Sequence, residues 1–384
     1  MLGSGTWETK APNRVKPRTA YWIAINFACL EDPRVDTPPC CTKIAAWWRR
    51  GAVNNNVTVM VGSVGQGVHR STDGGETWSR ISVGQGLHSD AIVRTLAVHP
   101  ANALEILCGT DLGLYKSVDS GASWSRVDSA LNAFCVWSLA IDPNDPKVIF
   151  AGTGTPTPAR IFRSTDGGLT WSQRPMDVAD ECAAVGVPRI TGIAIDPDNP
   201  KSIWAGIEVD GLRHSADGGD SWSRVGESIP NMDFHNVSVV SGPPKRVFAI
   251  VNNDAYFSED EGESWESVRA KENFPWTYSR GVCTSPANGK TLFVTVGDTT
   301  PGSDGAVMRS EDTGMTWERV PLPDQPNSAM WVVNLQAWDP DVVFAGSRYG
   351  YLYRSDDAGH SWSRIGREFS EISSIIWVPT QSPN

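Results

Sequence analysis

Eight side chains in this 384-residue chain have the types needed for acid–base chemistry and for binding an anionic or ring-shaped ligand. Imidazole and carboxylate groups transfer protons, guanidinium groups bind anions, and aromatic faces contact rings. We therefore predict four catalytic residues: His88, Asp111, Glu208 and His235. We predict that four further residues bind substrate: Trp276, Arg280, Arg348 and Tyr349.

Three arrangements of these groups stay open. Two carboxylates about 5 to 9 Å apart would suit glycoside hydrolysis. His88 and His235, from comparable loops, would suit a metal ion or proton transfer. Arg189, Arg280 and Arg348 would suit a carboxylate, because the guanidinium fork matches its geometry. The first two have structural alternatives, in which Asp111, a candidate for the carboxylate pair, shapes a turn and the two histidines are solvated loop residues. The sequence leaves the metal and the cofactor undetermined.

A sevenfold repeat must position these residues. The pattern Ser-x-Asp-x-Gly-x-(Ser/Thr)-Trp starts at Ser71 and ends with its seventh copy at Ser355, with successive copies 43 to 52 residues apart. The repeated aspartates are Asp73, Asp119, Asp166, Asp217, Asp260, Asp312 and Asp357. Aspartate at this place accepts hydrogen bonds from turn N–H groups, and glycine supplies a positive φ. We therefore predict that all seven aspartates are structural.

Each repeat also contains four short apolar runs between Gly, Pro and Asp turns, as in Ser138–Thr153. Such runs predict strands, and four strands repeated every 40 to 50 residues predict a propeller blade. The expected fold is all-β: a seven-bladed β-propeller with four antiparallel strands per blade. We assign residues 1–17 to an irregular extension and 18–384 to one propeller.

The two ends of the chain are expected to pair in one shared blade, because an open ring would expose strand edges. The tail Glu371–Pro379 resembles an innermost strand. Lys43–Gly51 competes for the same position, and Tyr21–Leu30 is also strand-like.

The repeat resembles the Asp box, or BNR repeat, over residues 43–366. Proteins with this box include sialidases, xyloglucan-cleaving glycoside hydrolases, sortilin-like receptors and a photosystem II assembly factor. Asp111, in CGTDLGLYKS, resembles the catalytic aspartate of the xyloglucanases. Those enzymes carry the other carboxylate on a second propeller, however, and this chain has one. The Arg-Ile-Pro signature of sialidases is also absent.

The topology of a propeller predicts where a ligand would bind. The boxes join the third and fourth strands, so the other loops surround the opposite mouth of the central channel, where function is expected. The polar and aromatic residues of those loops are Gln66, His88, Asp90, Asp111, Asp177, Asp180, Glu181, Arg189, Glu208, Asp210, Asp233, His235, Asn252, Asn253, Asp254, Trp276, Tyr278, Arg280, Asp298, Trp331, Arg348, Tyr349, Arg367 and Glu368.

The composition limits the classes of molecule that the protein is expected to bind. A net charge of −11 argues against nucleic acid and against an anionic membrane. The N-terminus lacks the apolar core of a secretory signal, so we expect a cytoplasmic location. Cys29, Cys40 and Cys41 form the one cysteine cluster that suggests redox or metal chemistry.

The leading functional prediction is a hydrolase or lyase that acts on a saccharide or small carboxylate in the central funnel. The alternative is a non-catalytic propeller that binds a peptide or protein. The oligomeric state is left undetermined.

Overall fold

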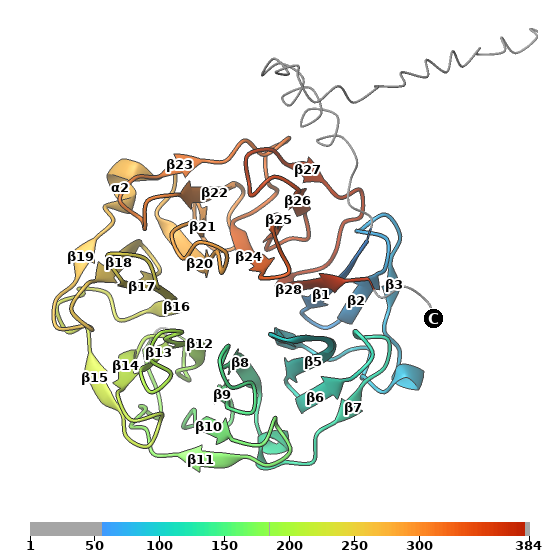
Figure 1. Cartoon of the computed structure of the whole chain (residues 1–384), viewed down its shortest axis with the longest axis horizontal. Coiled ribbons are helices and arrows are strands. Elements are labelled where there is room, and N and C mark those ends of the chain that lie inside the picture. The colour runs from blue at the N-terminus through green and yellow to red at the C-terminus, as the bar shows by residue number, and fades with distance from the viewer. Residues whose placement is uncertain (1–55, 184, 381–384) are drawn as a thin grey trace, which may run out of the picture. The chain divides into compact units, whose positions relative to one another are not determined.

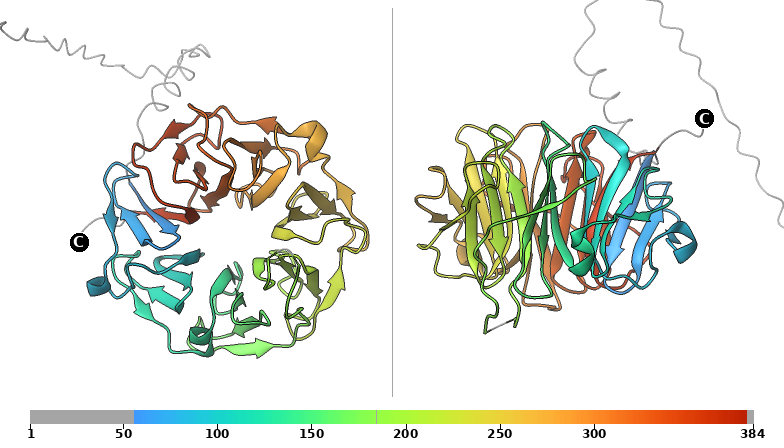
Figure 2. Two further views of the ribbon diagram at one scale, coloured as in Figure 1. Left: turned by 180° about the vertical axis from the view of Figure 1, so that it is seen from behind. Right: turned by 90° about the horizontal axis from the view of Figure 1, so that it is seen from below.

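Seven four-stranded antiparallel sheets surround a central axis in the computed structural model, which describes residues 56–183 and 185–380 (Figure 1). The predicted fold class is therefore confirmed. Figure 2 shows the same ring from behind and from the side. The predicted extension 1–17, the segments Tyr21–Leu30 and Lys43–Gly51, and Cys29, Cys40 and Cys41 lie outside the described residues.

We number the blades from the first described strand. Within each blade the strands below are given from the axis outward. Blades 1 to 3 consist of β28 (Ile372–Pro379), β1 (Val57–Ser63), β2 (Gly67–Ser71) and β3 (Ser79–Arg80); β4 (Val93–His99), β5 (Asn102–Thr110), β6 (Gly113–Ser117) and β7 (Ser125–Arg126); and β8 (Val136–Ile141), β9 (Ile149–Thr153), β10 (Ile161–Ser164) and β11 (Ser172–Arg174).

The other four blades follow the same order. They consist of β12 (Ile190–Ile195), β13 (Ile203–Ile207), β14 (Gly211–Ser215) and β15 (Ser223–Val225); β16 (Phe234–Val240), β17 (Arg246–Val251), β18 (Asp254–Ser258) and β19 (Glu266–Ser267); β20 (Tyr278–Thr284), β21 (Leu292–Gly297), β22 (Gly305–Ser310) and β23 (Glu318–Arg319); and β24 (Met330–Gln336), β25 (Asp339–Ser347), β26 (Leu352–Ser355) and β27 (Ser363–Arg364).

Helices are short in the described part of the chain. They are two 3₁₀ turns, η2 (Val83–Gln85) and η3 (Ala130–Ala133), and one α-helical turn, α2 (Ala270–Asn273). Among the described residues, no helix has the length and apolar character needed to cross a membrane.

The core lies between adjacent blades. The second strand of a blade has neighbours on both faces, so it is apolar throughout rather than alternating, and all five residues of β13 are buried. One core cluster joins Phe150 and Ile161 of blade 3 to Ile190 and Ile203 of blade 4. The outermost strands are only two or three residues long, which limits the exposed sheet edge.

The C-terminal strand closes the ring. β28 pairs antiparallel with β1, with Val59 opposite Trp377 and Gly62 opposite Ser374. The two ends of the propeller therefore share blade 1, as predicted from the tail sequence. β28 occupies the innermost position for which Lys43–Gly51 also competed.

The seven Asp boxes form the same hydrogen bonds. In the first box, the Asp73 carboxylate accepts bonds from the Ser71 hydroxyl (2.7 Å), the Thr77 amide (2.9 Å) and the Thr77 hydroxyl (2.6 Å). These bonds recur in the other six boxes. They hold the pKa of Asp166 at about 2, with the Thr170 hydroxyl as the largest cause. The predicted turn-stabilising bonds are thus present.

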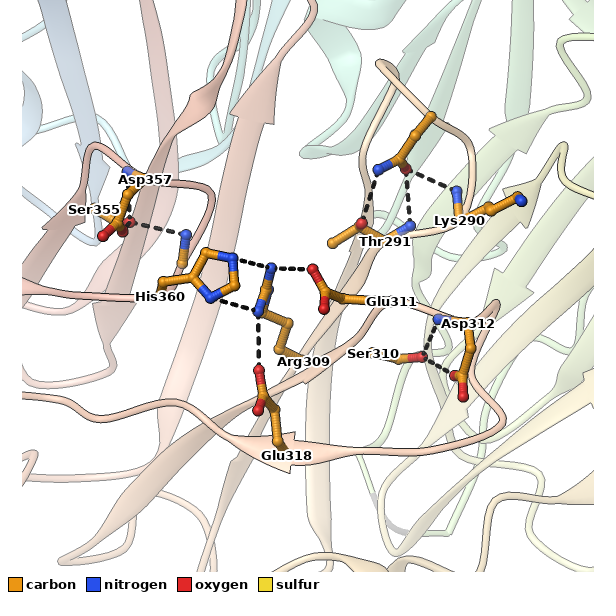
Figure 3. A network of polar contacts seen from close by, with 12 residues as sticks. Lys290, Thr291, Arg309, Ser310, Glu311, Asp312, Glu318, Ser355, Asp357 and His360 are labelled. Atoms are coloured by element: carbon orange, nitrogen blue, oxygen red, sulfur yellow. Dashed lines mark hydrogen bonds and ion pairs between the residues drawn. The ribbon is translucent and has the colours of Figure 1, made fainter. Parts of the chain in front are cut away.

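The boxes also link neighbouring blades. Arg163 of blade 3 donates to the carbonyl of Gly218 in the next box (2.6 Å), and Arg354 of blade 7 reaches Gly74 of blade 1 (2.8 Å). Between blades 6 and 7, the buried Arg309 contacts both imidazole nitrogens of His360 and is flanked by two glutamates, Glu311 and Glu318 (Figure 3). A buried guanidinium needs such partners, because unpaired burial of its charge is costly.

Candidate functional site

A cavity of about 420 Å³ lies at the mouth of the central channel, on the face opposite the Asp boxes. All seven blades contribute to its lining, which places it on the axis. Four arginines, three carboxylates and one histidine are among the lining residues. A volume of several hundred Å³ suits a small molecule, although so polar a wall is unusual for a drug-like ligand.

A β-bulge in each innermost strand directs one side chain toward this cavity. The pairing of the inner strand with the second strand skips one residue near its start, or two in blade 6. An extra residue in a bulge is left out of the ladder, and its side chain is re-aimed. The bulged residues that line the cavity are Arg94, Trp137, Thr191, His235, Arg280, Trp331 and Ser373.

Two tryptophans hold the four arginines. The guanidinium carbons of Arg94 and Arg189 lie 4.1 and 4.8 Å from the Trp137 ring centroid. Those of Arg280 and Arg348 lie 4.4 and 4.3 Å from the Trp331 ring centroid. Stacking on indole orients a guanidinium while leaving its N–H groups free to donate.

The arginines differ in their ion pairs. Arg189 pairs with Glu208, and Arg348 pairs with Glu371 of the neighbouring blade at 3.0 Å. Neither Arg94 nor Arg280 has a carboxylate within ion-pair distance among the described residues. Two cationic groups therefore line the cavity without a fixed counterion, which favours an anionic ligand.

Glu208, Asp233 and His235 form a second group on the same wall. One ligand atom of each lies within 4.8 Å of the others. Glu208 directly follows β13, Asp233 precedes β16, and His235 is the bulged residue of β16. Their side chains are 10%, 19% and 3% exposed, respectively. The blade geometry thus joins two carboxylates and an imidazole that are separated along the chain.

Hydrogen bonds hold Asp233 in place. Asn252 donates to its Oδ2 at 2.9 Å, and Asn231 in turn donates to the side-chain Oδ1 of Asn252 at 2.6 Å. Burial by itself raises the pKa of Asp233, but His235, Asn252 and the charge of Arg280 outweigh burial and hold that pKa below its ordinary value. Asp233 is therefore an anion at neutral pH, suited to act as a base or as a ligand.

Four of the eight predicted site residues line this cavity: Glu208, His235, Arg280 and Arg348. Arg189 lines the cavity as well, so all three arginines of the open alternative lie around it. The predicted mouth, opposite the boxes, is where the cavity lies. The roles of these lining residues in catalysis or binding remain predictions.

The other four residues do not line the cavity, so the expectation that they face the axis is wrong. Asp111 is exposed because its carboxylate turns back to accept the Ile92 amide hydrogen (2.8 Å). His88 is exposed in the loop after β3, where its Nδ1 faces the Asp90 amide. Trp276 packs against the core cluster of blades 5 and 6. Tyr349 is 43% exposed, one residue beyond Arg348.

The catalytic and binding predictions omitted several lining residues. Asp233, Tyr278 and Trp331 stood only in the wider loop set. Arg94, Trp137 and Glu371 were missed because they fall in segments read as inner strands or as the tail. Aligning those strands reveals a signal, since Arg94, Trp137 and Trp331 each occupy the second position of an inner strand. A large polar or aromatic residue there is out of place in a buried strand.

Comparisons with known proteins agree on the class. The BNR/Asp-box repeat model matches residues 69–80 and 162–173, and the Sortilin-Vps10 model (Sortilin, neurotensin receptor 3) matches residues 253–382. Together with the seven boxes and the seven blades, these matches define the chain as a BNR-type β-propeller.

Individual relatives are distant. A xyloglucanase of Hypocrea jecorina is 25% identical over 349 residues, which cover 75% of this chain and 40% of that protein. The photosystem II assembly lipoprotein Ycf48 of Synechococcus is 24% identical over 235 residues, covering 54% of this chain and 64% of its own. The chain thus spans less than half the length of the Hypocrea enzyme.

Two solved structures show the same fold. A GH74 xyloglucanase from Xanthomonas campestris has a TM-score of 0.56 at 20% identity, covering 71% of this chain and 45% of its own. The structure titled YCF48 bound to D1 peptide has a TM-score of 0.50 at 19% identity, covering 72% and 81%. At these identities the likeness concerns the fold alone.

Proposed function

We propose that the protein binds a ligand that carries a carboxylate, either an acidic saccharide or a small carboxylic acid, at the mouth of the channel. We further propose that it acts on this ligand as a hydrolase or lyase. The observation that carries the proposal is the pair Arg94 and Arg280. Both stack on tryptophan, both line the cavity, and neither has a carboxylate partner among the described residues.

The chemistry is supported by the neighbouring group of Glu208, Asp233 and His235. These three side chains can transfer a proton or bind a cation. The low identity to xyloglucanases supports a glycoside-cleaving propeller in general terms. A neutral xyloglucan chain fits less well, because the two tryptophans are already covered by guanidinium groups.

The test compares substrates that differ in charge. The full chain is incubated with trigalacturonate and, separately, with the neutral cellotriose and a xyloglucan heptasaccharide. Hydrolysis yields new reducing ends only, whereas elimination also creates a double bond conjugated with the carboxylate, which absorbs ultraviolet light. We expect binding and turnover of the acidic trisaccharide and neither for the neutral sugars. Equal or better binding of the neutral sugars would contradict the proposal.

A matched pair of variants locates the effect. Arg280→Gln should weaken trigalacturonate binding by about tenfold or more, since a charged hydrogen bond contributes about 1.5 to 3 kcal/mol. Arg126→Gln is the control, because this exposed arginine lies outside the cavity and donates to the backbone carbonyls of Leu112 and Asn132. Equal losses in both variants would argue for a non-specific charge effect and against the site.

A second candidate is a non-catalytic propeller that binds the C-terminal carboxylate of a peptide. The observation that favours it is again the stacking of two arginines on each tryptophan, which leaves less ring surface for a sugar. The fold likeness to the peptide-bound Ycf48 structure is consistent with it. Tight binding of a peptide acid but not of its C-terminal amide, with no saccharide turnover, would favour this candidate.

A further inference from the structure

The position of one proton on His235 sets the chemistry of the Glu208–Asp233–His235 group. Its Nδ1 lies 2.7 Å from the backbone carbonyl oxygen of Ser279. A carbonyl oxygen only accepts, so Nδ1 carries the hydrogen and donates it. In the neutral ring, the other nitrogen, Nε2, then faces Asp233 Oδ1 with its lone pair. This tautomer, fixed by a backbone carbonyl, is the one that metal-binding histidines adopt.

The distance between these two atoms does not suit a direct contact. Nε2 lies 3.6 Å from Asp233 Oδ1, which is longer than a hydrogen bond. Asp233 Oδ1 is buried and has no hydrogen-bond partner within residues 56–183 and 185–380, and the His235 side chain is 97% buried. A buried lone pair and a carboxylate oxygen repel each other unless a positive charge lies between them.

The same distance suits two ligands of one metal ion. Bonds of about 2.0 to 2.2 Å, as in zinc sites, separate neighbouring ligand atoms by roughly 3.0 to 3.6 Å. Glu208 supplies the third donor, since one ligand atom of each residue lies within 4.8 Å of the other two. We propose that Glu208, Asp233 and His235 bind a divalent transition-metal ion such as Zn²⁺ or Mn²⁺.

The surroundings support a built site. Asn252 holds the second oxygen of Asp233, and Arg189 pairs with Glu208, so both carboxylates are oriented by other side chains. The two carboxylates supply the anionic oxygen donors that such an ion takes. One nitrogen and two carboxylate donors resemble the ligand sets of open metal sites, which keep a position for water or ligand. If the proposed function holds, as this step assumes, the carboxylate of the ligand would occupy that open position.

The test measures metal binding directly and needs no substrate. The full chain is treated with EDTA, dialysed, and titrated with Mn²⁺ and with Zn²⁺ in separate calorimetric experiments, with electron paramagnetic resonance to follow Mn²⁺. We expect one ion per chain and a rise in melting temperature, because a ligand that binds only the folded state stabilises it. Absence of binding by both ions would overturn the proposal and leave a proton at Nε2 as the bridging charge.

Variants assign the ligands. Asp233→Asn keeps the shape of the side chain and should weaken binding at least tenfold, as should His235→Gln. The matched control His88→Gln changes an exposed histidine outside the cavity and should bind the metal as well as the parent chain. Circular dichroism identifies any variant that fails to fold. If a folded Asp233→Asn and a folded His235→Gln both retain full affinity, the assignment is wrong.

The outcomes for the metal and for the substrate are separable. Metal binding without turnover of trigalacturonate would leave the metal site standing and contradict the enzymatic proposal. Turnover that persists after EDTA treatment, with no metal bound on titration, would do the reverse.

Discussion

The two faces of the propeller repeat in different ways. At the Asp boxes, both the backbone and the residues recur, and the same aspartate, serine and glycine positions make the same bonds in every blade. At the mouth, only the backbone recurs. Every inner strand has a bulge, but the bulged side chains range from Arg94 to Trp137 and Ser373. Repetition of residues marks the scaffold, and divergence at a repeated backbone position marks the candidate site.

The difference has a physical cause. The polar groups of a box must be hydrogen-bonded within a tight turn. Few residues can replace the aspartate, whose short carboxylate accepts these bonds, or the glycine, which adopts the positive φ. The absent Cβ of the box glycine also makes room for the preceding blade, as Gly121 does for Met60. A bulged side chain that faces a water-accessible cavity meets no such constraint, so its chemistry is free to vary.

The largest expected effect is the loss of folding stability when a tryptophan of an Asp box is removed. Trp124 is 5% exposed and belongs to a core cluster that joins blades 1 and 2. Trp124→Ala should lower the free energy of unfolding by about 3 to 5 kcal/mol, because it leaves a cavity. The matched control at the mouth, Trp137→Ala, should change it by about 1 kcal/mol or less. Urea denaturation measures both, and equal losses would remove the distinction between the two faces.

The next largest effect should be the pH dependence of the free energy of unfolding that arises from the buried His69. Burial, together with the charges of Arg367 and Arg80, lowers the pKa of His69 to about 4. The unfolded chain binds this proton below about pH 6.5 and the folded chain does not, so stability falls as pH drops from about 6.5 to about 4. We expect a loss of roughly 3 kcal/mol over that window, since each pKa unit corresponds to about 1.4 kcal/mol. In His69→Gln, unfolding curves at pH 7 and pH 4.5 should differ less; an unchanged difference would exclude His69 as the cause.

A smaller effect is expected from the residue that positions the arginines. Trp331 contacts Arg280 and Arg348 and contributes little to the hydrophobic core. Trp331→Leu should reduce the affinity for trigalacturonate about threefold to tenfold, in line with the roughly 1 kcal/mol of a cation–π contact. Trp331→Phe should restore most of it, which a purely structural role would not predict. Calorimetric titration measures both, together with the melting temperature.

The smallest effect should come from Asp111. Its carboxylate is exposed and caps one amide, so Asp111→Ala should lower stability by about 1 kcal/mol or less and leave ligand binding unchanged. A large, selective loss of turnover in this folded variant would move the active site away from the axial cavity. It would then support a xyloglucanase-like role for Asp111.

The sequence by itself determined the architecture, because the information that specifies a blade is local. The box bonds join residues two to four apart, and the strand pattern needs only short apolar runs between turns. The same local logic identified the tail as the strand that closes the ring. The position of the mouth followed from the connectivity alone, which is why Glu208, His235, Arg280 and Arg348 could be predicted.

Only the tertiary structure decided which loop side chains meet. Asp111 and Glu208 both directly follow the second strand of their blades, yet one caps an amide and the other lines the cavity. That choice depends on hydrogen bonds to neighbours outside the repeat pattern. Arg94 and Trp137 reach the cavity through bulges, and a single strand sequence does not show where its register shifts by one residue. The orientation of the His235 ring, with Nε2 toward Asp233, likewise depends on the Ser279 carbonyl of the next blade, 44 residues away in the chain.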